Sequence, residues 1–479
     1  MQISSTKSLT LLRLVMINII AVDSLRNISI TAQAGWVVVS FYVLAGIVFL
    51  IPCTLLTAQM ATRYPKNGGI YLWTKEAFGA KTGFIILWLQ WVYNLVWFPS
   101  ICGFFAGIIA YIIAPWFWVS PNELVMSSWY MISMSLCIFW LATIINLFGI
   151  KTSSTLSVIG AIIGTLMPML LIIGLALFWV MAGNPILKPQ TLSYMLPNLA
   201  NISSWSLFLT VMFSLFGLEM SSIHASNVKN PKKNFPKALL ISSIVILLSL
   251  ILSNIAIFTV NSDTGGQINI VTGLIASFNY FFTQFNMPWM LDVIALTLVL
   301  GAFTTLAAWI MGLSRAFTIA AEDGLISKKL AQTNKHEAPS KVLILQGIIF
   351  SLFCLSYVLM PSVNSAYWFL SVLTAQLAVL AYIGMFAAAI KLRGQSLPTS
   401  GQYVIFGGMK GTIIIASLGF IGCIIAISVG FIPSSDVTMS VLNFDLLLLV
   451  GIVIALVIPY FITRNYQELN FVTTYEDKE

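Results

Sequence analysis

Charged residues are scarce in this sequence, since Asp, Glu, Lys and Arg make up only 8% of its 479 residues. A soluble chain carries about 25% charge, so the composition excludes an ordinary globular protein in water. Hydrophobic residues make up 59%, and their apolar surface is suited to lipid. The sequence therefore predicts an all-α polytopic membrane protein. The net charge of +8 would suggest nucleic acid in a soluble chain, but here no nucleic-acid partner is expected.

Histidine is also rare, because His224 and His336 are the only two. They lie too far apart in sequence to suggest a metal site, and no H-E-x-x-H, G-x-S-x-G or Walker motif occurs. We therefore expect no enzyme activity and no cofactor. The five cysteines all lie in apolar runs, which predicts free core thiols and no disulfide framework; they are Cys53, Cys102, Cys137, Cys354 and Cys423.

Long apolar runs are what the sequence has in abundance. A hydrocarbon core about 30 Å thick requires about 20 residues for each helical crossing. Twelve runs meet this length, so we predict twelve transmembrane helices. They fall near residues 9–32, 35–61, 82–114, 124–150, 153–182, 203–228, 237–261, 288–318, 341–361, 365–391, 411–432 and 441–463.

The positive charges follow this division of the chain. With both termini in the cytoplasm, all of the 23 Lys and Arg residues except Lys188 and Arg26 fall on the cytoplasmic side or at its edge. This bias predicts the orientation of the helices. We expect a multi-pass protein of a bacterial inner membrane, present as a monomer or weak homodimer in the lipid bilayer.

Residues 211–240 begin as an apolar run but contain Gly217 and Glu219 in mid-membrane. Glycine weakens a helix, and a carboxylate at this depth costs about 2.5–3.5 kcal/mol or more unless it faces protein, water or a partner. The run therefore predicts a helix that breaks at residues 216–219 and exposes backbone groups to a bound molecule.

The first span carries a similar interruption, with Asp23, Ser24, Arg26 and Asn27 in the middle of an apolar run. Two broken helices five spans apart predict a five-plus-five inverted repeat. We expect a single transporter domain with repeats at about 9–182 and 203–391, two trailing helices at about 411–463 and a short cytoplasmic tail at 464–479. The broken ends offer carbonyl groups to an ammonium and N–H groups to a carboxylate, as an amino acid requires.

Two interpretations remain open for the polar residues at the breaks. Asp23 and Arg26 are three residues apart, so they either form a structural ion pair or contact the substrate or Glu219 during transport. Glu219 is either an acceptor for backbone N–H groups at the break or a titrating group that couples proton movement. Elsewhere, Asn94 is a polar group that must find a partner inside the protein.

Two aromatic residues also have two interpretations each. Trp309 interrupts a row of small residues in the eighth span, and it is either a gate over the substrate or a packing residue. Tyr382 in the tenth span either covers a central site or belongs to the core.

Several motifs along the chain together resemble one family. They are P-x-x-G-G-x-Y from Pro65 to Tyr71, G-x-E at 217–219 followed by VKNPKKNFPKAL, WIMGLSRAF from Trp309, and AAEDGLI after it. In this order they resemble the amino acid–polyamine–organocation superfamily, and the chain is most similar to the bacterial glutamate/GABA antiporter branch. The resemblance implies the inverted-repeat fold and secondary transport of amino acids or their decarboxylation products by alternating access.

The resemblance also implies site residues, and the sequence departs from the family at some of them. The first break reads AVDSLRN, whereas many relatives are rich in glycine there. In our interpretation, the Arg26 side chain binds the substrate carboxylate in place of the backbone N–H groups. Thr305 stands where the glutamate/GABA branch has a carboxylate, which argues against acid-gated glutamate exchange. The fifth span has no internal lysine, so proton symport is not assigned.

The sequence thus predicts a secondary transporter of an amino acid or derivative, most simply an exchanger. An ion-coupled symporter and, less simply, a non-transporting sensor on the same scaffold remain alternatives. The predicted substrate-binding residues are Val22, Asp23, Ser24, Leu25, Arg26, Asn94, Phe216, Gly217, Leu218, Glu219, Trp309 and Tyr382.

Overall fold

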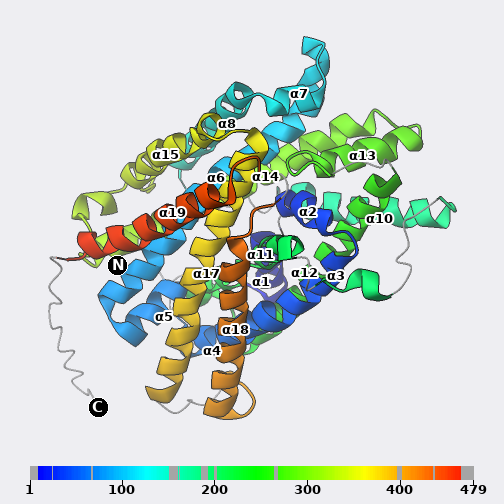
Figure 1. The fold of residues 1–479 in the computed structure, drawn as a ribbon. Coiled ribbons are helices and arrows are strands. Elements are labelled where there is room, and N and C mark those ends of the chain that lie inside the picture. The colour runs from blue at the N-terminus through cyan, green and yellow to red at the C-terminus, as the bar shows by residue number, and fades with distance from the viewer. Residues whose placement is uncertain are drawn as a thin grey trace, which may run out of the picture.

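The computed structural model describes residues 9–23, 25–65, 68–149, 160, 162–184, 192–198, 202–263, 268–395, 402–434 and 437–464. Regular structure in these ranges is helical, apart from one isolated bridge between Leu9 and Val228. The fold is therefore all-α, as the composition predicts (Figure 1).

The first part of the chain contains one interrupted helix followed by long ones. Its helices are α1 (Leu11–Val22), α2 (Leu25–Thr31), α3 (Val37–Ala45), α4 (Ile51–Arg63), α5 (Gly69–Phe78), α6 (Ala80–Ile113), α7 (Pro121–Met126), α8 (Ser128–Leu147) and α10 (Met167–Met181). Two π-helical turns, Gly46–Leu50 and Ile162–Leu166, lie directly before α4 and α10.

The second part again starts with an interrupted helix. Its helices are α11 (Ser206–Phe213), the 3-10 helix Leu218–Asn227, α12 (Pro231–Asp263), α13 (Gly273–Gln284), α14 (Met290–Glu322), α15 (Ser340–Cys354), α16 (Ser356–Leu359), α17 (Val363–Gln395), α18 (Gly408–Gly430) and α19 (Val441–Ile462). Short 3-10 turns occupy several of the connections.

Ten helical stretches in the described part of the chain are long and apolar enough to cross a membrane. The predicted first and sixth spans are not among them, because α1 and α11 stop after 12 and 8 residues. These observations agree with a polytopic membrane protein, while the count of twelve spans stays a prediction.

Two connections differ from the sequence prediction. The segment between the second and third spans contains the buried helix α5, and the segment after α12 contains α13. Both helices are short and contain polar residues, so their apolar character falls below that of a membrane span. Both nevertheless bury one face against longer helices, and α5 packs on α6 and α17. Tertiary packing therefore stabilises helices that a search for long apolar runs does not find.

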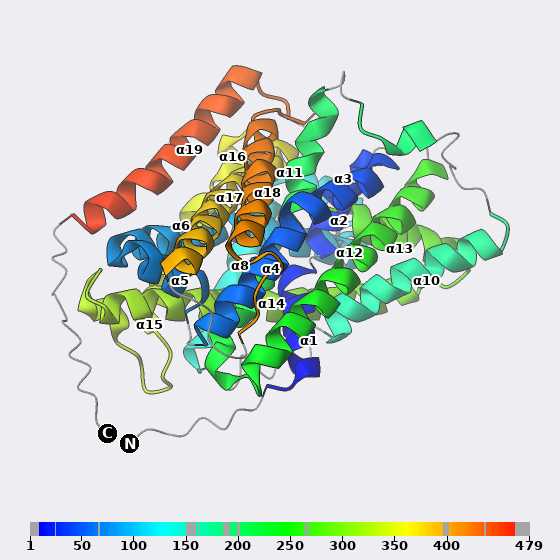
Figure 2. The same cartoon turned by 90° about the horizontal axis from the view of Figure 1, so that it is seen from below.

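The helices divide into an inner and an outer set. In the most apolar windows of α6 and α17, 78% of the residues are buried, against 17% in α19. Figures 1 and 2 show α6 and α17 inside the bundle and α19 along its outer edge. Large apolar side chains on α19, such as Leu442 and Phe461, are exposed, as expected of a helix that faces lipid.

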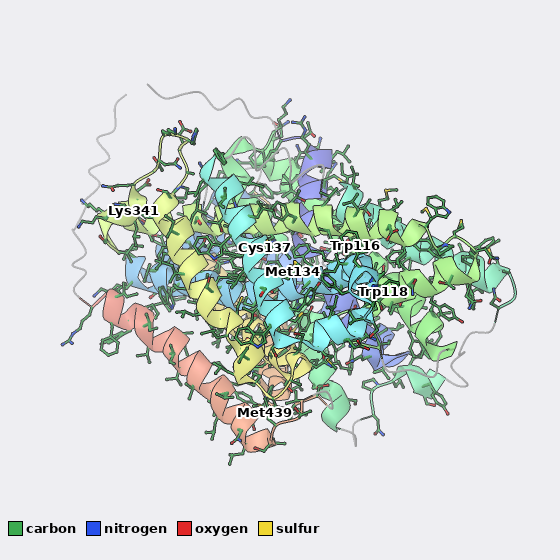
Figure 3. All side chains as sticks on the ribbon, turned by 90° about the horizontal axis from the view of Figure 1, so that it is seen from above. Trp116, Trp118, Met134, Cys137, Lys341 and Met439 are labelled. Carbon is green, nitrogen blue, oxygen red and sulfur yellow. The ribbon has the colours of Figure 1, made fainter. Side chains whose placement is uncertain are left out.

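The two ends of the bundle differ in chemistry. Three tryptophans near the start of α7 and α8 are exposed, namely Trp116, Trp118 and Trp129. Figure 3 places Trp116 and Trp118 away from Lys341, which begins α15 beside the end of α19. Tryptophan suits a membrane interface, and lysine suits the cytoplasmic surface, so both patterns fit a protein that spans a bilayer.

The cysteines are all free. Four of them are buried, but Cys137 is exposed on α8 (Figure 3). The expectation of core thiols is therefore wrong for Cys137, because this position lies on the outward face of a helix that is buried along only part of its circumference.

Candidate functional site

The first helix interruption lies at Asp23, as the sequence predicts. Helix α1 ends at Val22, where the Asp23 backbone turns to an extended conformation with φ −64° and ψ 100°. The Asp23 N–H still bonds to the Ile19 carbonyl at 2.7 Å. Helix α2 then begins at Leu25, and all of its residues are buried. The final carbonyls of α1 therefore lack the helical partners that an unbroken helix would provide.

The second interruption starts earlier than predicted. Helix α11 ends at Phe213, three residues before the predicted break at 216–219. Tight turns follow, in which Leu215 and Phe216 donate to carbonyls three residues back. Ser214 contributes to the earlier end, because its hydroxyl bonds to the Val211 carbonyl at 2.6 Å and such local bonds compete with helix formation. The turns end at Gly217, whose φ of +110° favours glycine.

The two interruptions touch each other through backbone atoms. A Cβ atom added at Gly217 would lie 2.9 Å from the carbonyl oxygen of Ala21 and 3.4 Å from its carbon. Glycine is therefore required here both by its φ angle and by the close approach of the first break. Segments 196 residues apart in the chain meet at this point.

Tyr382 on α17 forms two hydrogen bonds with residues of the second interruption. Its hydroxyl accepts a hydrogen bond from the Gly217 N–H at 2.9 Å and donates one to Oε2 of Glu219 at 2.6 Å. Glu219 is 1% exposed, and its Oε1 has no hydrogen-bond partner among the described residues. The Tyr382 ring packs on Phe216 with ring centroids 4.7 Å apart. Tyr382 therefore fixes the backbone and the carboxylate of one turn together.

A cavity of about 70 Å³ lies where the interruptions meet. Residues from both breaks, from α6 and α14 and from the π-helical turn before α10 line it. They are Ala21, Val22, Asp23, Leu25, Arg26, Asn27, Tyr93, Asn94, Trp97, Ile101, Phe104, Gly164, Thr165, Phe213, Phe216, Gly217, Ala302, Thr305 and Trp309.

The two charged residues of this cavity do not pair with each other. Arg26 is fully buried, and its guanidinium donates to Oγ of Ser371 at 2.6 Å and to Oδ1 of Asn27. Its Nε has no partner in the described structure. The carboxylate of Asp23 accepts from the Ser249 hydroxyl at 3.2 and 3.3 Å.

The predicted structural ion pair between Asp23 and Arg26 is therefore wrong. The interruption separates the two residues, since Asp23 is extended and follows α1, whereas Arg26 belongs to α2. A spacing of three brings side chains together only on a continuous helix. Asp23 bonds to α12 and Arg26 bonds to α17. The carboxylate of Asp23 and the guanidinium of Arg26 thus belong to one cavity, and each has only neutral hydrogen-bond partners among the described residues.

Eight of the twelve residues predicted for the site line this cavity. They are Val22, Asp23, Leu25, Arg26, Asn94, Phe216, Gly217 and Trp309. Leu218, Glu219 and Tyr382 lie outside the lining, behind the second interruption. Ser24 lies outside the described residues. Asn94 finds its partner within its own helix, because its Nδ2 donates to the Gln90 carbonyl at 2.8 Å.

Sequence reasoning missed most of the lining from α6. Tyr93, Trp97, Ile101 and Phe104 recur at intervals of three or four residues and so share one face of the helix. The sequence shows this common face, but it does not show that the face turns toward the cavity, because both faces of α6 are apolar. On α14, Ala302 and Thr305 precede Trp309 by seven and four residues and follow the same rule. The rings of Trp97 and Trp309 meet edge to face, with centroids 6.0 Å apart.

Glycine sets one wall of the cavity. The π-helical turn before α10 crosses α14 so closely that a Cβ on Gly164 would lie 2.0 Å from the Gly301 Cα. A Cβ on Gly301 would lie 2.1 Å from the Gly164 Cα. Neither position admits a side chain. Small residues of this kind let helices approach closely in a membrane.

Comparison with known proteins places the chain in a family. The family model described as amino acid permease matches residues 6–458. An uncharacterized transporter of Legionella pneumophila is 41% identical over 465 residues, which cover 97% of this chain and 98% of the relative.

More distant relatives carry more specific names. A glutamate/gamma-aminobutyrate antiporter of Lactococcus lactis subsp. lactis is 27% identical over 432 residues, with 88% of this chain and 84% of the relative covered. A probable agmatine/putrescine antiporter of the same organism is 23% identical over 368 residues, with 77% and 76% covered. The helical fold, the two interruptions that meet at a cavity and these matches agree. The chain belongs to the amino acid permease family, within the amino acid–polyamine–organocation superfamily.

Proposed function

We propose that this protein is a secondary transporter that exchanges an amino acid or amino acid derivative across the cytoplasmic membrane by alternating access. The observation that carries the proposal is the meeting of two interrupted membrane helices at one cavity. Non-helical backbone at membrane depth is tolerated only where it is buried in protein or lines a cavity. In transporters such breaks bind the substrate.

The charges of the cavity support a zwitterionic substrate. Asp23 and Arg26 are both buried and line the cavity, and each has only neutral hydrogen-bond partners in the described structure. Buried charges are stable when they are paired. An amino acid supplies both missing partners, with its ammonium toward Asp23 and the last carbonyls of α1, and its carboxylate toward Arg26.

The aromatic residues of the cavity then form its cover. Trp309 lies against Trp97, and Phe216 packs against both Phe49 and Tyr382. In our proposal Trp309 and the second interruption close over the substrate before the protein reorients. The inverted repeat, with its two-fold axis in the membrane plane and both termini in the cytoplasm, is part of this proposal.

Exchange is favoured over ion coupling on the names of the relatives, since two of the three described above are antiporters. Thr305 lines the cavity where the resemblance implies a carboxylate, and this difference argues against acid-gated glutamate as the exchanged substrate. Ion-coupled symport is the second candidate, and the specific observation for it is the buried carboxylate of Glu219 with one unpartnered oxygen.

Counterflow in proteoliposomes tests the proposal. Vesicles preloaded with an unlabelled amino acid should take up the labelled one faster than empty vesicles. A non-transporting sensor would show no acceleration with any of the twenty amino acids, GABA, agmatine or putrescine, and that result would overturn the proposal. For the second candidate, Glu219→Gln should alter the pH dependence of uptake; an unchanged profile would remove the coupling role of Glu219.

A further inference from the structure

A second cavity lies away from the helix interruptions. Its volume is about 600 Å³, a size typical of small-molecule sites. Its lining is mainly apolar and aromatic. It consists of Trp88, Trp91, Phe317, Gly324, Leu325, Ile326, Ser327, Leu330, Leu345, Ile349 and Ile462. None of these residues lines the cavity at the interruptions, so the transport mechanism proposed above does not use them.

Three aromatic rings that contact one another form one wall of this cavity. The rings of Trp91 and Phe317 are stacked with centroids 4.5 Å apart, and Trp88 lies 5.4 Å from Trp91. The Trp88 indole donates to the Ala455 carbonyl on α19 at 3.0 Å. This hydrogen bond connects the aromatic wall to α19.

The lining residues come from the same end of four membrane helices. Trp88 and Trp91 lie in the first third of α6, and Phe317 lies near the end of α14. Leu345 and Ile349 are the sixth and tenth of the 15 residues of α15, and Ile462 is the last residue of α19. Figure 3 shows Lys341, at the start of α15, on the same side of the molecule as the end of α19 and opposite Met439. The cavity thus lies at the end of the bundle that carries Lys341 and the C-terminal end of α19.

Positive charges border the cavity. Lys328 and Lys329 lie between the lining residues Ser327 and Leu330, and both are exposed. Lys341 is one helical turn before Leu345, and Arg464 is two residues after Ile462; both are exposed as well. None of these four cations has an acidic partner among the described residues.

The acidic groups nearby do not cancel this charge. Glu322 and Asp323 precede the lining residue Gly324. Asp323 is already held by Lys75, with 2.6 Å between Nζ and Oδ2, and by the hydroxyl of Tyr71. Glu322 and Glu337, which is four residues before Lys341, are the other acidic residues in the segment 322–341 that carries the bordering lysines. Two carboxylates face four cations, so the border of the cavity is positive on balance.

One polar group of a lining residue lacks a hydrogen-bond partner among the described residues. Trp91 is 2% exposed, and its indole Nε1 has no hydrogen-bond partner in the described structure. A buried N–H group without an acceptor is unfavourable. An occupant with an oxygen acceptor close to an apolar chain would satisfy it.

We infer that this second cavity binds an anionic phospholipid. One acyl chain occupies the space along Trp91, Phe317 and Leu345, the ester region accepts from the Trp91 indole, and the phosphate lies against Lys328, Lys329 and Arg464. Basic pockets between membrane helices on the cytoplasmic side bind anionic headgroups in this way. The inference is independent of the proposed function, because it concerns a different cavity.

Native mass spectrometry of the full-length, delipidated protein tests this inference. The probes are phosphatidylglycerol and phosphatidylcholine with identical acyl chains. Wild type should retain one phosphatidylglycerol under activation that strips phosphatidylcholine. The double variant Lys328→Gln/Lys329→Gln should lose this preference. The matched control, Lys233→Gln/Lys237→Gln, removes two exposed lysines from α12 and should keep it.

A second variant addresses the acyl chain. Ile349→Trp fills the cavity and should reduce retention of both lipids; because it can also disturb packing, the lysine variants carry the test on their own. Equal retention of the two lipids by wild type, or equal losses in the lysine variant and its control, would overturn the inference. A variant truncated after Arg464 provides a further check. If it bound more phosphatidylglycerol than the full-length protein, residues 465–479 would be the natural occupant of the cavity, and the inference would again fail.

Discussion

The hydroxyl group of Tyr382 bonds to both sides of one turn, since it donates to Oε2 of Glu219 at 2.6 Å and accepts from the N–H of Gly217 at 2.9 Å. Tyr382 thus ties α17 to the second helix interruption. Tyr382, for which one interpretation of the sequence is a cover over the substrate, does not line the cavity. It instead fixes the position of the Gly217 backbone, which does.

Replacing Tyr382 by Phe should lower both stability and transport. The change leaves a buried carboxylate oxygen and a buried N–H without their partner, and a lost bond to a charged group is worth about 1.5–3 kcal/mol. We expect a lower Tm for the purified protein and a lower initial rate of exchange. The matched control is Tyr367→Phe, because the Tyr367 hydroxyl is buried without a hydrogen-bond partner in the described residues. Equal effects of the two variants would contradict the role of Tyr382.

Gly217→Ala should abolish uptake while the protein is still produced. The new methyl group would lie 2.9 Å from the Ala21 carbonyl oxygen at a φ of +110°, and a strained backbone of this kind costs about 1–3 kcal/mol. Gly312→Ala on α14 is the control, because a Cβ there meets no atom within 4 Å. Normal uptake by the Gly217 variant would argue strongly against a substrate site at the interruptions.

Arg26→Gln should weaken the binding of amino acids but not that of the corresponding amines. Loss of the guanidinium removes a charge-assisted contact of about 1.5–3 kcal/mol, so the affinity for an amino acid should fall by about 10- to 150-fold. The affinity for its decarboxylated amine should change little. Asp23→Asn should show the reverse pattern, with the deaminated acid spared. Binding measured by thermal shift checks both, and uniform losses for all ligands in both variants would show that the residues only support the fold.

Asp323→Asn should destabilise the basic end of the bundle slightly. Lys75 and Tyr71 on α5 both bond to the Asp323 carboxylate, which belongs to the segment after α14. The side chains of Lys75 and Asp323 are 34% and 29% exposed, so the ion pair itself is worth at most about 1 kcal/mol. Tm should fall more for Asp323→Asn than for Lys75→Gln, which leaves the tyrosine contact. Glu322→Gln is the neighbouring control, and a fall of equal size there would exclude a specific contact.

Composition and charge placement were sufficient to predict the membrane class, because lipid imposes apolar runs of fixed length. The interruptions at Asp23 and near Gly217 were also predictable, since a carboxylate or glycine at mid-membrane conflicts with an unbroken helix. The earlier end of α11 was not, because it depends on the bond from Ser214 to the Val211 carbonyl. Local bonds of this kind depend on the conformation and cannot be read from residue type alone.

The side-chain partners at the site were the least predictable part. Spacing suggested that Asp23 pairs with Arg26, but the interruption between them sends each to a different helix. The lining residues Tyr93 and Trp97 needed knowledge of which face of α6 turns inward. That choice is made by the neighbouring helices and not by α6 itself, since both faces of this helix are apolar and mostly buried.

The contact between Gly164 and Gly301 has a practical consequence for anyone who wishes to redesign this protein for a bulkier cargo. Where two backbones already meet without side chains, no atom is left to trim, so that wall cannot be moved back by mutagenesis. Extra room must instead come from the aromatic lining residues Tyr93, Trp97 or Trp309, whose rings can be replaced by smaller side chains.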